Sequence, residues 1–153
     1  MQAESLASLF GLVHRVLHVN TDGITHEESL RKPEPGGNSM NWILGHLVAT
    51  RNGALRLLEA EPVWSDTEAA PYQRGAAGDV ADPIRFERIL SDLDRSQDRL
   101  LAAISDLTAE RLATQVKDGT LGDRLAFLHF HESYHAGQLG LLRRLLGKEG
   151  AIR

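Results

Sequence analysis

Residues 125–146 read LAFLHFHESYHAGQLGLLRRLL, a run without proline in which apolar side chains recur at the spacing of an α-helix. The stretch HESYH inside it places His131 and His135 four residues apart. Side chains at this spacing project from one face of a helix, about one turn from each other. Both imidazoles can therefore reach a single metal ion, because each metal–nitrogen bond is only about 2 Å long.

The same five letters match H-E-x-x-H, the metal-binding helix of zinc metalloproteases, in which Glu132 would be the general base. That interpretation needs a third ligand further along the chain, where the only carboxylate side chain after His135 is Glu149. The extended metalloprotease pattern also fails, because Gln138 and Leu141 stand where it requires glycine and histidine. A peptidase is therefore the less favoured interpretation.

The other histidines narrow the search for a third ligand. His129 lies about 160° from His131 on the helical wheel, so it cannot share a site with the pair. Gln138 returns to nearly the same face as His131 and can hydrogen-bond a ligand imidazole. His14 and His18 form a second i, i+4 pair, which we interpret as a structural or surface pair at the edge of an apolar stripe.

Four segments have the apolar periodicity of long amphipathic helices. They span residues 3–19, 41–60, 83–105 and 121–146. Ser39 or Asn38 is the expected N-cap of the second segment. For the third we expect Asp82 as the N-cap and Pro83 in the first helical position.

Residues 61–82 lack apolar periodicity and contain prolines and glycines, which indicates a loop longer than most connections in compact domains. We find no convincing strand. The sequence therefore predicts an all-α fold, a four-helix bundle with a long crossover loop between helices two and three. A length of 153 residues predicts a single domain over residues 1–153. Gly45 and Gly53 in the second helix predict that a neighbouring helix comes close.

Composition excludes several classes of function. A formal net charge of −4 and a pI near 6.0 provide no positive field for nucleic acid. Without cysteine the chain has no disulfide, thiolate metal site or cysteine nucleophile, so histidine, carboxylates or water must hold any metal. His14, Arg15 and His18 interrupt what would be the apolar part of a signal peptide, and no apolar run is long enough to span a membrane. We therefore expect a cytoplasmic protein that binds neither nucleic acid nor membranes.

Two motifs together resemble the DinB/YfiT-like family, part of the DinB superfamily. They are NWILGHL over residues 41–47 and HESYHAGQL over residues 131–139. The family pattern covers nearly the whole chain in the expected order. The resemblance implies a DinB-like four-helix bundle, typically homodimeric, that holds a divalent metal such as nickel or zinc. Carried over residue by residue, His46, His131 and His135 correspond to the three metal ligands of the family.

Three histidine ligands leave coordination positions open, as catalytic metal sites do. The family includes thiol-dependent transferases and isomerases that act through bacillithiol or mycothiol. Because this chain has no cysteine, a thiol reaction would need a diffusible low-molecular-weight thiol. The resemblance thus implies a metal-dependent enzyme, such as a low-molecular-weight-thiol S-transferase, acting on a small-molecule substrate.

Several alternatives stay open beside the transferase. The protein could be a metal-binding, stress-related protein without catalysis, a metal-dependent hydrolase, or a bundle whose histidines are structural. Glu132 is the candidate for a catalytic group near the metal, and Arg51, Tyr134 and Trp64 are further candidates to line the pocket. Small residues on the last helix permit close helix approach, either within the bundle or across a dimer; they are Ser133, Ala136, Gly137 and Gly140.

Overall fold

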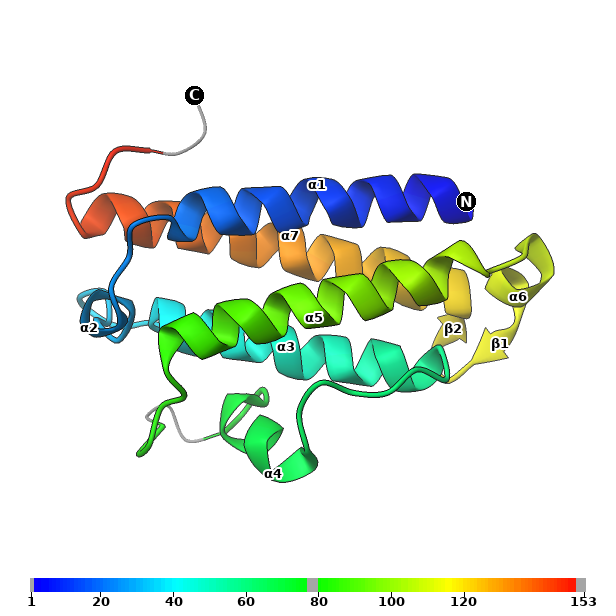
Figure 1. The fold of residues 1–153 in the computed structure, drawn as a ribbon, viewed down its shortest axis with the longest axis horizontal. Coiled ribbons are helices and arrows are strands. Elements are labelled where there is room, and N and C mark those ends of the chain that lie inside the picture. Colours follow the sequence, from blue (N-terminus) through cyan, green and yellow to red (C-terminus); the bar gives the residue numbers. More distant parts are fainter. Residues whose placement is uncertain (1, 77–79, 151–153) are drawn as a thin grey trace.

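The computed structural model describes residues 2–76 and 80–150, and four long helices form a bundle (Figure 1). These helices are α1 (Ala3–Thr21), α3 (Met40–Leu57), α5 (Phe86–Ser105) and α7 (Leu121–Leu145). Helix α1 packs against α7 and α5, and α3 packs against the same two helices from the opposite side. The fold is therefore the predicted all-α bundle. Within the described part of the chain, none of the helices is both long and apolar enough to cross a membrane.

The direction of the helices explains why the connection between α3 and α5 is long. Both helices run the same way in Figure 1, opposite to α1 and α7, so the chain must return along the bundle between them. This crossover contains the short helix α4 (Asp66–Ala69) and the 3-10 turn η1 (Ala70–Tyr72). The remaining connections carry α2 (His26–Ser29) and α6 (Ala109–Ala113).

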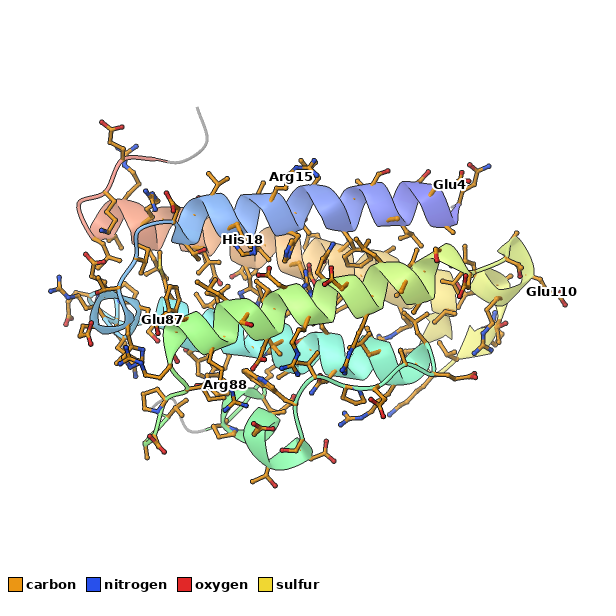
Figure 2. All side chains as sticks on the ribbon, in the orientation of Figure 1. Glu4, Arg15, His18, Glu87, Arg88 and Glu110 are labelled. Atoms are coloured by element: carbon orange, nitrogen blue, oxygen red, sulfur yellow. The ribbon has the colours of Figure 1, made fainter. Side chains whose placement is uncertain are left out.

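Apolar side chains of the four long helices fill the centre of the bundle, as their spacing predicts. The outer faces are charged, and Figure 2 shows Glu4 and Arg15 of α1 pointing away from the bundle. Helix ends follow the capping signals in most places. Ser39 accepts a hydrogen bond from the backbone N–H of Trp42 at 3.2 Å, and Thr120 forms a capping box with Asp123 at the start of α7.

The predicted start of α5 is wrong, because the helix begins at Phe86 rather than at Pro83. Tertiary contacts hold the preceding residues in an extended path. The backbone N–H of Ile84 donates to Tyr72 Oη at 2.9 Å, and the Ile84 carbonyl accepts from Asn41 Nδ2 at 2.8 Å. The first helical N–H, that of Phe86, donates to His26 Nδ1 at 3.2 Å, so a side chain from α2 takes the capping role expected of Asp82.

The expectation of no strand is also wrong. A two-stranded hairpin joins α6 to α7, with β1 (Gln115–Val116) antiparallel to β2 (Gly119–Thr120). Asp118 and Gly119 have φ values of 66° and 125°, the left-handed region that a tight hairpin turn requires. A strand pair of only two residues each leaves no alternating pattern long enough to read from the sequence.

The crossover is anchored to the bundle by buried polar contacts. Asn52 of α3 accepts from the Val63 N–H at 2.8 Å and donates to the Trp64 carbonyl at 2.9 Å. The indole Nε1–H of Trp64 donates to Asp92 Oδ2 of α5 at 2.6 Å. All three of these side chains are buried, so the crossover packs as part of the core.

Gly45 allows the closest approach between α3 and the crossover. A Cβ atom at this position would lie 2.2 Å from Cδ1 of Tyr72, whose ring is buried against the helix backbone. The predicted close neighbour of Gly45 therefore exists, although it is the turn η1 and not one of the long helices. The same prediction is wrong for Gly53, where a Cβ atom would meet nothing within 4 Å.

Candidate metal centre

His46 of α3 and the pair His131 and His135 of α7 meet at one point between the two helices. The Nε2 atoms of His46 and His131 lie 3.1 Å apart, and those of His135 and His131 are also 3.1 Å apart. Around a tetrahedral ion with bonds of about 2.0–2.1 Å, neighbouring ligand atoms lie about 3.3 Å apart. The spacing of the three nitrogens therefore fits a single divalent ion between them.

Hydrogen bonds to the other ring nitrogens decide which atoms face this point. His46 Nδ1 donates to the carbonyl of Tyr72 at 2.8 Å, and His135 Nδ1 donates to Gln138 Oε1 at 2.7 Å. A neutral imidazole that donates through Nδ1 carries a lone pair on Nε2. Carbonyl partners of this kind orient metal-binding histidines and fix their tautomer. Gln138 thus has the supporting role that the sequence predicts for it.

These tautomers leave the metal-free arrangement unsatisfied. The lone pairs of His46 and His135 both point at His131 Nε2, which carries at most one proton. In at least one of the two nitrogen–nitrogen contacts, two lone pairs therefore face each other with no proton between them. His131 Nδ1 is also buried, with no hydrogen-bond partner among the described residues. A cation at the shared point would satisfy all three Nε2 atoms at once, so the residues present fit a metal.

Burial keeps the three imidazoles neutral, the form that binds metal. Burial, together with the neighbouring His135 and His46, lowers the pKa of His131 to about 4. Burial also lowers the pKa of His46 and that of His135, although hydrogen bonds to Tyr72 and Gln138 partly oppose the shift. At neutral pH the site therefore offers nitrogen lone pairs and no competing protons.

Two aromatic residues restrict the ligand rings. The ring of Trp42 stacks on that of His46 with centroids 4.8 Å apart and an angle of 11° between the planes. Tyr134 lies edge-on to His135 with centroids 5.3 Å apart, and its hydroxyl accepts from Gln138 Nε2 at 3.3 Å. Trp42 was not among the residues predicted to line the site, although its place one turn before His46 on α3 was a usable signal.

The family comparison is decisive for the identity of the fold. Residues 10–139 match the profile of the DinB superfamily. This chain belongs to the DinB superfamily. Its fold is also similar to the crystal structure of a conserved protein from Enterococcus faecalis, with a TM-score of 0.76 and 17% sequence identity, over 97% of this chain and 99% of the other. A search of curated proteins finds no match.

Glu132 of this DinB protein lies beside the centre in sequence, but Arg51 of α3 holds its side chain. Arg51 Nε donates to Oε1 at 2.7 Å and Arg51 Nη2 donates to Oε2 at 2.8 Å. Neither side chain has any exposed surface. Both carboxylate oxygens are therefore engaged in a buried, bidentate ion pair. A role of Glu132 in proton transfer stays a prediction, and its observed contacts are structural.

The other candidates divide between surface and core. Tyr134 is 58% exposed and lies beside His135, in reach of the centre, whereas Trp64 is buried against Tyr72 and Asp92. His129 is outside the centre as predicted, because its ring packs edge-on against Phe10 of α1 with centroids 5.8 Å apart.

An open cavity of about 500 Å³ adjoins the centre of this DinB protein, and both His46 and His131 line it. Arg74 of the crossover and Arg124 of α7 lie in its wall, next to the half-exposed ring of Phe127. The Arg124 guanidinium lies 5.8 Å from the centroid of that ring. The cavity wall thus presents two imidazoles, three guanidinium groups and an aromatic surface to a small molecule.

Proposed function

We propose that this DinB protein is a metal-dependent enzyme that holds zinc or nickel on His46, His131 and His135. We further propose that it joins a diffusible low-molecular-weight thiol to a small-molecule substrate. The observation that carries the proposal is the convergence of three neutral imidazoles whose lone pairs are unsatisfied without a cation. The adjoining cavity supports an enzyme because it gives a small molecule access to two of the ligand rings.

A divalent ion bound by three nitrogens has open positions and favours the thiolate form of a thiol beside it. The residues of the chain supply the rest. Tyr72 and Gln138 keep Nε2 of His46 and His135 directed at one point, and Trp42 limits rotation of the His46 ring. Such fixed ligand geometry is what an open metal site needs to keep its free positions on the cavity side.

The charges in the cavity indicate an anionic group on the bound molecule. Arg74 and Arg124 have no carboxylate partner among the described residues, whereas the third arginine of the wall, Arg56, pairs with Asp66. Free guanidinium groups bind carboxylates and phosphates in a bidentate manner. We therefore propose that the thiol or its acceptor carries a carboxylate or phosphate, with an apolar part against Phe127.

A second candidate is a metal-binding protein without catalysis. The carboxylate closest in sequence to the ligands, Glu132, is held by Arg51, so no buried acid or base is free beside the imidazoles among the described residues. Under this alternative the metal centre forms equally well but no thiol conjugation follows. Metal analysis and turnover thus separate the two functions.

The test uses tag-free protein and two measurements. Elemental analysis should find metal bound at this centre, and His46→Ala should remove that ion while His129→Ala, outside the centre, leaves it in place. Thiol conjugation is then measured with a panel of electrophiles and with bacillithiol, mycothiol and glutathione. Conjugation lost in His46→Ala and weakened in Arg124→Gln supports the enzyme. A metal content per chain that His46→Ala leaves equal to that of the wild type would overturn the site, and a loaded protein inactive with every thiol would favour the non-catalytic role.

Glu132→Gln addresses the proton-transfer hypothesis once a substrate is known, because glutamine keeps the shape of the side chain and removes its basicity. Unchanged turnover would eliminate that role.

We also propose a homodimer. Leu12 and Leu141 are 51% and 61% exposed beside a groove between α1 and α7, and the small residues Ala136, Gly137 and Gly140 line it. An exposed apolar surface of this kind is typical of an interface between proteins. Light scattering of the wild type and of Leu12→Glu tests the proposal, since a wild type that stays monomeric at high concentration would exclude it.

A further inference from the structure

A second group of metal-binding side chains lies on the opposite pair of helices. His14 and His18 of α1 approach Asp94 of α5, which the sequence alone could not connect with them. Both imidazoles meet the same carboxylate oxygen: His14 Nε2 lies 3.0 Å and His18 Nε2 lies 2.6 Å from Asp94 Oδ1. Figure 2 shows His18 on the side of α1 that faces α5. The two histidines, which the sequence analysis interprets as a structural or surface pair, thus share a third partner.

The spacing of the two histidines in this cluster repeats that of the pair in the first centre. His14 and His18 have the same i, i+4 spacing as His131 and His135, and their ring centroids lie 4.7 Å apart. Ligand atoms around a tetrahedral ion lie about 3.3 Å apart, somewhat further than the observed nitrogen–oxygen distances. Small rotations of the exposed His18 and Asp94 side chains would open enough room, because neither is packed in the core.

Charges of both signs face the cluster. Asp94 contributes one negative charge directly. On the inner side, the Arg51 guanidinium opposes a cation near His14 and the Glu132 carboxylate attracts one. These two groups pair with each other, but Arg51 has the larger effect at His14 and Glu132 offsets only part of it, so Asp94 is the main carboxylate that attracts a cation here. Burial, with a smaller contribution from Arg51 and His18, lowers the pKa of His14 to about 4, so the ring is neutral and available as a ligand.

We propose that His14, His18 and Asp94 form a second divalent-metal site. Two imidazoles and one carboxylate suit zinc or iron(II), whereas calcium and magnesium prefer an all-oxygen set. The side chains of His18 and Asp94 are 39% and 51% exposed, so the ion can enter from solvent and keep water in its remaining positions. An ion here would tie α1 to α5, while an ion at the first centre ties α3 to α7.

This proposal does not rest on the proposed function. The two sites share no residue and no helix, so each can be removed while the other stays intact. Loss of the first centre in His46→Ala would leave the second unaffected.

The experiment measures zinc stoichiometry and affinity on tag-free protein freed of metal with a chelator. Zinc is added in competition with a chromophoric chelator, and bound zinc is determined by elemental analysis after gel filtration. The wild type should bind two zinc ions per chain. Asp94→Asn and His18→Ala should each bind one, His46→Ala should bind one, and the combination of His46→Ala with Asp94→Asn should bind none.

Matched controls separate a ligand from a general charge effect. Asp98→Asn removes an exposed carboxylate one turn further along α5 and should leave two zinc ions bound. Calcium in place of zinc should not compete. Circular dichroism checks that each variant folds, which the surface positions of His18 and Asp94 favour. A wild type that binds a single zinc ion, or a second ion that Asp94→Asn retains, would overturn the proposal.

Discussion

Replacing Glu132 with leucine would leave the Arg51 guanidinium buried without a counter-charge. In the wild type this guanidinium has no exposed surface, and two of its nitrogens donate to Glu132 at 2.7 Å and 2.8 Å. The third nitrogen keeps the Leu93 carbonyl and Ser96 Oγ, each at 3.1 Å, in the variant. Those neutral acceptors do not offset the lost carboxylate, because transfer of an isolated charge from water to a protein interior is strongly unfavourable.

The expected loss is large. Removing one partner of a buried ion pair lowers the free energy of unfolding by about 3–5 kcal/mol. In a domain of this size each 1 kcal/mol shifts the melting temperature by about 2–4 °C, so Glu132→Leu should melt roughly 10 °C below the wild type. Removing both charges should cost far less, since apolar side chains of similar volume often replace a buried pair without loss. Arg51→Met with Glu132→Leu should therefore recover most of the stability.

Urea unfolding of the metal-free protein, followed by circular dichroism at pH 7, provides the measurement. The two single variants and the double variant form a cycle, and we expect a coupling energy of at least about 2 kcal/mol between Arg51 and Glu132. Asp66→Asn breaks the exposed pair with Arg56 and should cost less than about 1 kcal/mol. If Glu132→Leu cost no more than Asp66→Asn, or if the single effects simply added, the reasoning would be refuted.

Three further predictions follow from the core and the centre. Gly45→Ala should lower the free energy of unfolding in urea by about 1–3 kcal/mol, because the added methyl group displaces the Tyr72 ring. Gly53→Ala on the same helix should raise it by about 0.5–1 kcal/mol, and equal effects of the two variants would contradict the contact. The metal-free protein should lose stability as pH falls from 6.5 towards about 4, because His131 takes up a proton at a higher pH in the unfolded chain than in the folded one. The urea midpoint should therefore fall across this range, and it should fall less in His131→Gln. Asn52→Ala should expose the crossover to limited proteolysis, and an unchanged cleavage rate would argue against its anchoring role.

Periodicity and capping signals predicted the long helices because each depends on neighbours in sequence. Ser39 caps α3 as its position indicates. The start of α5 could not be predicted in the same way, because His26, 60 residues earlier, supplies the acceptor for the Phe86 N–H. A local signal such as Asp82-Pro83 fails where distant contacts hold the backbone extended.

In the candidate site, too, features that depend on neighbours in sequence could be predicted and contacts between distant residues could not. The i, i+4 spacing of His131 and His135 was readable from a helical wheel, but His46 came only through the family resemblance, and the structure brings it to the pair. Nothing local connects Glu132 with Arg51 or His18 with Asp94, since both contacts join helices. In each case the sequence predicts the two helices. It does not predict how each helix is rotated about its own axis, and that rotation determines which side chains are in contact.

Tyr72 connects the crossover to the candidate metal centre without supplying a ligand. Its ring fills the space that Gly45 leaves, its hydroxyl accepts from the Ile84 N–H, and its carbonyl orients His46. If the crossover opened locally, His46 Nδ1 would lose its hydrogen-bond acceptor and the tautomer of His46 would no longer be fixed. The free energy of closing the crossover would then contribute to the affinity for an ion. By reciprocity, a bound ion should slow amide hydrogen exchange at Ala70 and Tyr72, although neither residue supplies a ligand atom. The residence time of the ion would then be set in part by a loop that never touches it.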